Sequence, residues 1–325
     1  MKNVLRHLVA GCTVFQLAFA GAAHAQPYPT KPVHILVALG PGSGTDTLTR
    51  LLAGKLTEVW GQPVVVENRA GGAGAVAGAA LVKAEPDGHT LMTYSDGHAV
   101  NAALNASTLP YDTLRDITRV SMLATFPTVL VVAPSLGVNS AKELIDLAKA
   151  KPGQLSFGSA GIGGGLHFSG ELFKLAANID AVHIPYKGPA EALGEVVAGR
   201  IQYMFAPLGP TLPLIKSRKV IPLAMGSAQR SPLMPELPTL GEDVLPGFAY
   251  ELWSGLFAPA KTPRPVVEKI NHAVERVMAL PEMKEQLAKQ AFSRRPNSPD
   301  EFDRFVRREV DKLRNVIKVA NIHVQ

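Results

Sequence analysis

The stretch VHILVALGPGSGTD, from Val33 to Asp46, joins an apolar run to a loop with three glycines. The run from Val33 to Leu39 predicts a buried β-strand. The apolar side chains that follow have helical spacing and end before Gly61, a residue typical of helix ends. These side chains are Leu48, Leu51, Leu52, Leu56 and Val59. A strand, a glycine-rich loop and a helix in this order are typical of α/β folds.

The same alternation continues along most of the chain. A capping box at Ser140 predicts a helix to Ala150, and Ser298-Pro299-Asp300-Glu301 predicts the start of the last helix. After Trp253 the chain is predicted to be mostly helical. The pattern predicts an α/β fold with mostly parallel sheets, and about 300 mature residues favour two domains. Further strands are predicted at 63–67, 89–94, 128–133, 155–159, 181–184, 203–206 and 221–225, and a further helix at 73–84.

A second glycine-rich joint, from Gly158 to Gly165, also follows a strand and precedes a helix. Glycine lets a ligand approach the backbone, and a helix start offers unpaired N–H groups with a favourable dipole. Ser43, Thr45 and Ser159 add hydroxyl groups, and neither loop contains Lys or Arg. Both joints are therefore candidate sites for a carboxylate or phosphate, although each alone is equally compatible with a tight strand–helix turn.

Several other classes of site do not fit the sequence. The glycines at 40, 42 and 44, with Glu67 at the end of the next strand, are similar to a dinucleotide-binding site. Their spacing is G-x-G-x-G, however, and such a site has G-x-G-x-x-G. No Lys follows them as in a P-loop, no serine lies in G-x-S-x-G, and the nine histidines lack metal-site spacing. The net charge of +6 is dispersed and only 6% of residues are aromatic, which disfavours a nucleic-acid surface. We predict no cofactor and no metal.

The N-terminus has the three parts of a secretory signal. Lys2 and Arg6 precede an apolar run from Leu8 to about Ala22, and Ala23-His24-Ala25 offers a cleavage site before Gln26. The run is short for a membrane anchor, which needs roughly 20 residues. Val9-Ala10-Gly11-Cys12 also fits a lipid-attachment box, which leaves a lipoprotein as the alternative. We predict that residues 1–25 are a cleaved signal peptide, that the mature protein is periplasmic, and that it has no cysteine, since Cys12 is the only one.

The order and the amino-acid sequences of many segments resemble those of the substrate-binding receptors of tripartite tricarboxylate transporters, the Bug family. The resemblance extends over nearly the whole mature chain, which makes it specific. The matching segments are PGSGTD at 41–46, RLL at 50–52, VENRAGG at 66–72, PDGHTL at 86–91, LPYD at 109–112, HIPYKG at 183–188, RS at 230–231, LPTL at 237–240 and WSGLFAP at 253–259.

This resemblance implies a type II periplasmic-binding-protein fold, in which two α/β lobes surround a ligand cleft. The first lobe would comprise residues 26–125 and 251–325 and the second residues 126–250, with crossings near Phe126 and Tyr250. The family captures a small carboxylate by closure of the lobes and delivers it to the membrane subunits of a transporter. Such receptors are usually monomers and are not enzymes.

The resemblance also implies a set of ligand-binding residues. Three departures from the family pattern, Ser43, Gly40 and Ala206-Pro207, leave the far end of the ligand open. Asp46 is either a first-turn helix acid or a group that orients water or a ligand ammonium, and Lys187 is either a ligand contact or an exposed side chain. The carboxylate end is assigned to Pro41, Gly42, Ser43, Gly44, Thr45, Asp46, Ser159, Ala160 and Gly161, and the cleft lining to Ser95, Asp96, Tyr186, Lys187 and Gly188. Apart from the resemblance, His167 is placed at the start of a helix, where it either faces the ligand or is a satisfied histidine near a domain surface.

Two other functions stay open at this point. A closed receptor could dock on a signalling protein in place of a permease, and the sequence does not separate these roles. An exported enzyme is the alternative from another class, and loss of turnover on replacement of Ser43 or Asp46 would support it. The identity of the carboxylate is also open, because one carboxylate-binding end fits many acids.

Overall fold

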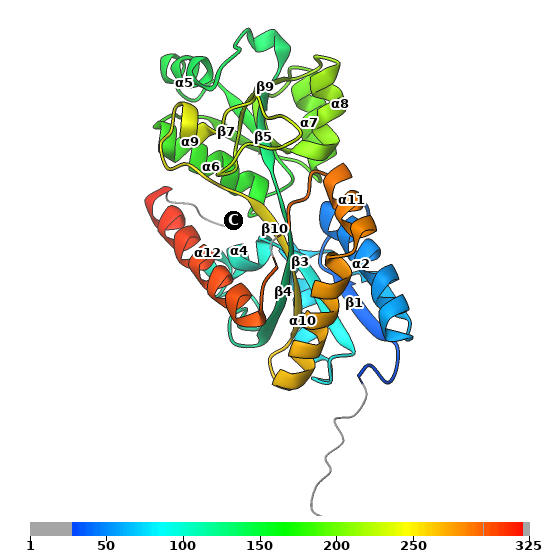
Figure 1. The fold of residues 1–325 in the computed structure, drawn as a ribbon. Helices are drawn as coiled ribbons and strands as arrows, with labels where there is room; N and C mark the ends of the chain where they lie inside the picture. The colour runs from blue at the N-terminus through cyan, green and yellow to red at the C-terminus, as the bar shows by residue number, and fades with distance from the viewer. Residues whose placement is uncertain (1–27, 295, 321–325) are drawn as a thin grey trace, which may run out of the picture.

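The computed structural model describes residues 28–294 and 296–320, and the predicted signal peptide lies outside these residues. The chain forms two lobes, each built around a five-stranded sheet (Figure 1). The strand order of the first sheet is β2-β1-β3-β10-β4, and that of the second is β7-β6-β8-β5-β9. The strands of the first sheet are β1 (Val33–Val37), β2 (Val64–Asn68), β3 (Thr90–Ser95), β4 (Ile117–Phe126) and β10 (Leu252–Pro259).

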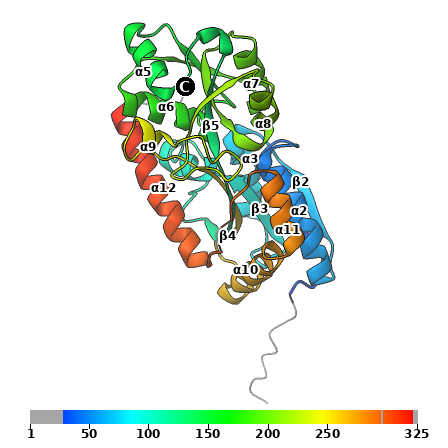
Figure 2. The same ribbon diagram turned by 45° about the horizontal axis from the view of Figure 1, so that its top comes forward.

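Helices cover both faces of the first sheet because each face carries apolar side chains. On one face α3 (Ala75–Lys83), α4 (Gly97–Leu104) and α12 (Pro299–Ala320) share one core cluster with the strands. On the other face α2 (Gly44–Trp60), α10 (Arg264–Met278) and α11 (Pro281–Lys289) share another. Figures 1 and 2 show α12 on one side of the lobe and α2, α10 and α11 on the other. A short 3-10 turn, η1 (Gly72–Gly74), precedes α3.

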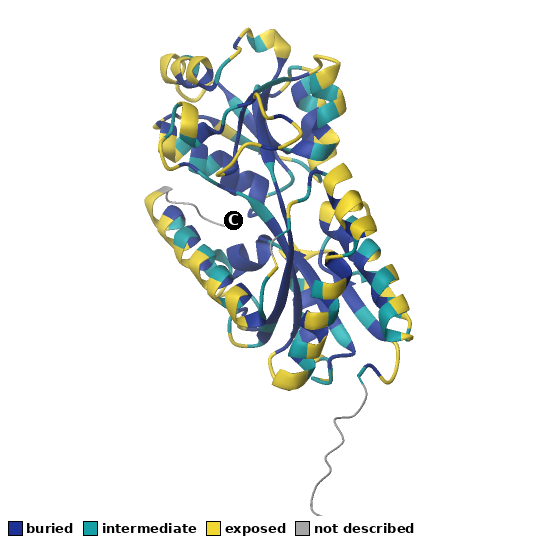
Figure 3. Ribbon diagram, viewed as in Figure 1, coloured by how far each residue is buried: buried dark blue, intermediate teal, exposed yellow. Residues whose placement is uncertain are grey.

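The second lobe has the same layered construction. Its buried strands lie between exposed helical faces, as the burial colouring shows (Figure 3). The helices α5 (Ala141–Ala150), α6 (Gly165–Ala177) and α9 (Leu240–Asp243) pack on one face, and α7 (Pro189–Val197) and the start of α8 (Leu208–Lys216) pack on the other. Its strands are β5 (Thr128–Val132), β6 (Ser156–Ser159), β7 (Val182–Pro185), β8 (Tyr203–Pro207) and β9 (Ile221–Met225), and the 3-10 turn η2 (Pro134–Leu136) follows β5.

The prediction of mostly parallel sheets was wrong. Each sheet has two parallel and two antiparallel pairings. In the first sheet the antiparallel pairings are those of β10, which lies between β3 and β4. The segment after Trp253 was predicted to be mostly helical, yet it begins with this strand. A strand that returns from the other lobe is not joined to its neighbours by a crossover helix, so it can pair antiparallel.

The chain passes from the first sheet to the second between β4 and β5 and returns between β9 and β10. At the first passage the ring of Phe126 packs against Phe292, with centroids 4.5 Å apart. At the second, the Tyr250 N–H donates to the Gly226 carbonyl at 2.8 Å. The exact lobe boundaries given above stay a prediction. No helix within residues 28–294 and 296–320 combines the length and the apolar character needed to cross a membrane.

Helix ends follow the local signals in the sequence. Gly61 ends α2 in the left-handed conformation, with φ of 63°. The Ser140 hydroxyl accepts from the Glu143 N–H at the start of α5. At the start of α12 the Ser298 hydroxyl accepts from the Glu301 N–H, and the Glu301 carboxylate accepts from the Ser298 N–H. These boundaries confirm the predicted caps.

Candidate functional site

The two glycine-rich joints lie at the carboxyl ends of strands from different lobes. The first joint, residues 40–46, follows β1, and the second joint, residues 158–165, follows β6. Because β1 and β3 are parallel neighbours about 5 Å apart, the first joint and the Ser95-Asp96 pair share one sheet edge. Asp96 in turn touches Gly165 at the start of α6. The site is therefore built where the edge of the first sheet meets the N-terminus of α6.

The first joint is held by the carboxylate of Asp46, which is only 3% exposed. One carboxylate oxygen, Oδ2, accepts from the Gly42 N–H at 2.9 Å and from Arg50 Nε at 3.2 Å. The other, Oδ1, accepts from Asn68 Nδ2 at 2.8 Å. The Ser43 hydroxyl caps α2 by accepting from the Asp46 N–H at 3.2 Å. The carboxylate of Asp46 thus links the loop at Gly42, helix α2 at Arg50 and strand β2 at Asn68.

The pKa of Asp46 reflects this arrangement. Burial alone would raise the pKa, but the hydrogen bonds from Arg50, Gly42 and Asn68 outweigh burial and lower it. The carboxylate is therefore ionised at neutral pH and pairs with the half-exposed Arg50 side chain, 3.1 Å away. Of the two predicted roles of Asp46, this geometry favours the structural one.

The second joint is held by neutral groups. The Ser159 hydroxyl accepts from the Gly161 N–H at 3.2 Å and lies 2.7 Å from Nε2 of His183. The Gly163 N–H donates to Nδ1 of His167 at 3.1 Å, which places the imidazole proton of His167 on Nε2. The two imidazole rings stack with centroids 4.0 Å apart.

Both histidines are neutral because of their surroundings. Burial is the main cause that lowers the pKa of His167, to about 4, and the nearby Lys174 adds to it. Burial also lowers the pKa of His183, to about 3, with further contributions from His167 and Lys174. Only a neutral imidazole has a nitrogen that can accept the loop N–H. His183 was missed at the sequence level, although it begins the recognised HIPYKG segment.

Asp96 forms one of the contacts between the lobes. Its side chain is buried, and its Oδ2 accepts from the Tyr250 hydroxyl at 2.9 Å. A Cβ atom at Gly165 would lie 1.9 Å from this oxygen and 2.3 Å from Leu252, so only glycine fits there. Burial raises the pKa of Asp96 to about 6, although hydrogen bonds from Tyr250 and Ser95 oppose the shift. Asp96 is thus packed between the lobes, beside the predicted site.

The remaining predicted residues lie around the second joint. The Tyr186 N–H donates to the Ser159 carbonyl at 3.0 Å, and the Tyr186 carbonyl lies beside Gly161. Lys187 is exposed, and its backbone N–H donates to Glu191 at 3.1 Å, next to the N-cap residue of α7, Gly188. No contact among the described residues links Lys187 to the first joint. Ala160 is half-buried within the joint.

Each joint leaves backbone donors unpaired at a helix start. Within the described parts of the chain, the N–H groups of Gly44 and Thr45 in α2 have no hydrogen-bond acceptor, nor do those of Gly164 and Gly165 at α6. Such N–H groups, with the positive end of the helix dipole, favour an anion. The sequence signal for this feature was the two glycine loops themselves.

The geometry offers less for catalysis. Ser159 and His183 have the spacing of a nucleophile and a base, but Ser159 is fully buried and its hydroxyl is bonded within the joint. A nucleophile must reach its substrate, and a fully buried hydroxyl does not, so this pair has a structural role. Across residues 28–294 and 296–320 there is no cluster of three or more His, Cys, Asp or Glu side chains that could hold a metal ion.

Comparison with known proteins identifies relatives over the whole described chain. A family model described as the tripartite tricarboxylate transporter family receptor matches residues 48–322. Protein BugT from Bordetella pertussis is 33% identical over 322 residues, which cover 97% of this chain and 98% of BugT.

Solved structures agree with the sequence comparison. An R. palustris protein solved with adipate is 33% identical and has a TM-score of 0.83. The match covers 91% of this chain and 99% of that protein. MatC from Rhodopseudomonas palustris, solved with bound malate, is 29% identical with a TM-score of 0.80, over 89% of this chain and all of MatC. The two sheets, the two lobes and these matches confirm the α/β periplasmic-binding-protein fold. The chain belongs to the tripartite tricarboxylate transporter receptor family of solute-binding proteins.

Proposed function

We propose that the chain captures a small carboxylate between the first and second joints. The observation that carries this proposal is the pair of helix starts with unpaired N–H groups, Gly44 and Thr45 on α2 and Gly164 and Gly165 on α6. They come from different lobes, and the start of α6 contacts the edge of the first sheet where Gly165 lies against Asp96. A carboxylate has two oxygens, so one oxygen can accept from the N–H groups of the first lobe and the other from those of the second.

The chemical class of the ligand rests on two supports. Neither joint contains Lys or Arg, so the ligand charge would be met by backbone dipoles and by the hydroxyls of Ser43 and Thr45. The structurally similar R. palustris protein and MatC hold adipate and malate, which are both carboxylates. The residues assigned above, from Pro41 to Asp46 and from Ser159 to Gly161, would surround the ligand carboxylate.

The proposed mechanism is closure of the two lobes about their two connecting segments. A ligand that contacts both joints stabilises the closed arrangement and shifts the equilibrium toward it. We infer that the closed receptor, in the periplasm after removal of residues 1–25, is the form that the membrane subunits of a tripartite transporter recognise. X-ray scattering should then show a smaller radius of gyration with a tight ligand than without one, and identical profiles would contradict closure.

Thermal melting of the chain from Gln26 to Gln325 against a panel of carboxylates tests the binding proposal. A ligand at about 100 times its Kd adds roughly 2.7 kcal/mol and should raise the Tm by several degrees. The matching amides should give no shift, because they lack the charge. Equal shifts with an acid and its amide would contradict recognition of a carboxylate.

A matched pair of glycine variants locates the site. Gly44→Leu adds a side chain at the first residue of α2, where its Cβ would lie 3.6 Å from the Phe292 ring and 3.9 Å from the Phe126 ring. Gly54→Leu changes an exposed position of the same helix where a Cβ meets nothing within 4 Å. The acid-specific shift should disappear in Gly44→Leu and persist in Gly54→Leu. Persistence in both variants would place the ligand elsewhere.

A further inference from the structure

A pocket lies at the far end of α6 from the second joint. It has a volume of about 460 Å³ and is lined by the end of α6, the segment 244–249 and Lys312 of α12. Leu172 and Leu175 are 7 and 10 residues beyond Gly165, which places them about 10 to 15 Å further along the helix axis. The pocket is therefore separate from the carboxylate site proposed above. Its size is within the range of small-molecule sites, about 300 to 1,000 Å³.

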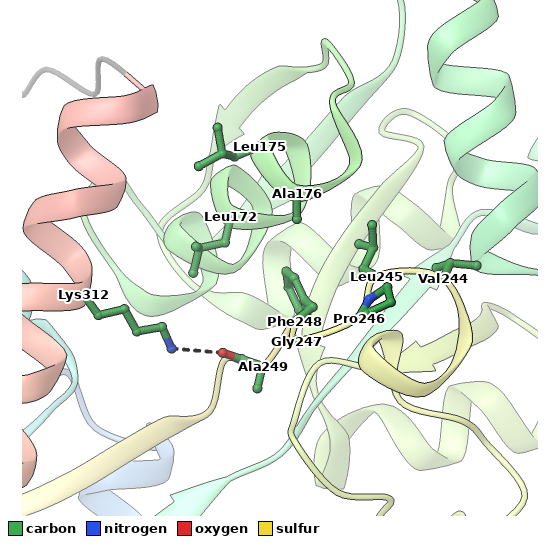
Figure 4. A pocket seen from close by; sticks show the side chains of 10 residues that line it. All are labelled: Leu172, Leu175, Ala176, Val244, Leu245, Pro246, Gly247, Phe248, Ala249 and Lys312. Atoms are coloured by element: carbon green, nitrogen blue, oxygen red, sulfur yellow. Dashed lines mark hydrogen bonds between the residues drawn. The ribbon is translucent and has the colours of Figure 1, made fainter.

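The walls of this pocket are mostly apolar. Leu172 and Leu175 form one side and Phe248 and Leu245 the other, as the close-up shows (Figure 4). Leu175 is 38% exposed, which is unusual for a large apolar side chain in this molecule. An apolar ligand body would cover this surface and gain the free energy of removing it from water.

A single cation lies at one end of the pocket. Nζ of Lys312 donates to the Ala249 carbonyl at 3.0 Å (Figure 4). It also lies 5.3 Å from the Tyr250 ring centroid. An ammonium has three N–H donors, so Lys312 retains donors for an anion. The charge of Lys312 acts on the carboxylate of Glu309, whose pKa is raised by burial, a shift that Lys312 opposes. Among the described residues, however, no carboxylate forms an ion pair with Lys312. The polar end of the pocket thus has a positive charge without a directly paired counter-charge.

We propose that this pocket is an accessory binding site for a monocarboxylic acid with an apolar body, of about the size of octanoate. The acid group pairs with Lys312 and the chain lies against Leu172, Leu175 and Phe248. A second carboxylate close to the apolar wall would be costly to desolvate, so diacids should bind more weakly than the monocarboxylic acid. Because α6 belongs to the second lobe and α12 to the first, the ligand contacts both lobes.

Calorimetric titration of the chain from Gln26 to Gln325 with octanoate tests this site. The titration is done in the Gly44→Leu background, so that binding at the first joint does not contribute. Octanoate should bind, and octanamide should bind at least tenfold more weakly because it lacks the charge-assisted bonds to Lys312. Absence of octanoate binding, or equal binding of the amide, would overturn the proposal.

Variants of the lining residues test the role of each part of the pocket. Lys312→Met should weaken octanoate binding at least tenfold, Lys312→Arg should retain it, and Leu175→Trp should block it by filling the pocket. Lys318→Met removes an exposed charge from the same helix and serves as the matched control, with unchanged binding. Unchanged melting of the free variants verifies folding. Equal affinity in Lys312→Met and in the parent would overturn the assignment of Lys312.

Discussion

The two joints of this receptor are held in shape by different chemical groups. Each must hold a glycine-rich loop in one shape while leaving the N–H groups of a helix start unpaired. The first joint uses an ionised carboxylate, Asp46, which is held by Arg50 and Asn68. The second uses two neutral imidazoles and a hydroxyl, from His167, His183 and Ser159.

The difference indicates which change would disrupt each joint. A carboxylate acceptor is strong but carries a negative charge beside the proposed anion site, so it needs the cation of Arg50 to balance that charge. The imidazoles add no charge beside the start of α6, but they function only while they stay neutral. We therefore expect the first joint to be sensitive to removal of one side chain and the second to be sensitive to acid.

Replacement of Asp46 should give the largest effect on stability. Asp46→Ala leaves the Gly42 N–H, Asn68 and Arg50 without their acceptor, and we expect the free energy of unfolding to fall by about 3 kcal/mol. Urea unfolding measures this change. Glu58→Ala, which removes an exposed ion pair on the same helix, is the control and should cost under about 1 kcal/mol. A loss for Asp46→Ala no larger than that of the control would refute the structural role.

Acid should weaken the second joint through His167. Its pKa is about 4 in the folded protein and 6.5 as a free side chain, so the unfolded chain binds the proton more tightly. Its contribution is complete above pH 6.5 and is lost as the pH falls toward 4, by about 3 kcal/mol for a shift of 2.5 units.

The difference between the parent and His167→Gln gives this contribution together with the part of the His183 pKa shift that His167 causes. Asp96 acts in the opposite direction, since its pKa is raised to about 6 and its contribution is lost as the pH rises from 3.8 to 6. Subtraction of the two pH profiles removes the Asp96 contribution, which is common to both proteins. A stability difference that stays constant between pH 4 and 6.5 would show that His167 does not titrate in this range.

Adjacent glycines at the start of α6 should respond differently to the same change. Gly165→Ala forces a methyl group against Asp96 and Leu252, and we expect a loss of about 2 kcal/mol with a shift in the relative position of the lobes. Gly164→Ala has ordinary contacts and a φ of −86°, so it should be tolerated. Urea unfolding and X-ray scattering of the pair measure both effects. Equal behaviour of the two variants would contradict the close contact between the lobes.

The smallest effect is expected for the cap of the first joint. Ser43→Ala removes the hydroxyl that accepts from the Asp46 N–H, at a cost of about 1 kcal/mol. Ser140→Ala removes an equivalent cap on α5, far from the site, at a similar cost. Only the change at Ser43 should also weaken carboxylate binding, and binding that is the same in both variants would separate this cap from the ligand.

The sequence predicted the features that depend on neighbouring residues. The joints, the end of α2 at Gly61 and the cap at Ser140 were all found because their signals lie within a few positions. Strand β10 was missed because its place in the sheet depends on β3 and β4, which are more than 120 residues away in the chain. Local pattern does not encode such pairing.

The local structure of the candidate site was predicted in part, whereas its role in ligand binding stays a prediction. The loops that offer N–H groups were identified from their glycines, and the resemblance supplied Ser95, Asp96 and Tyr186. The groups that hold the loops were not identified, since Asn68 and His183 reach them only after the strands pair. The buried contact of Asp96 with Gly165 and Tyr250 required the two lobes to be placed side by side.

The position of β10 between β3 and β4 bears on the order in which the molecule folds. All five strands of the second sheet lie between residues 128 and 225, so that sheet can form without any later part of the chain. The first sheet remains divided, with free edges on β3 and β4, until residues 252–259 insert between them. Free strand edges favour aggregation, and long-range pairing is slow. The N-terminal strands of a newly made chain therefore need protection from aggregation for the longest time, although they are made first.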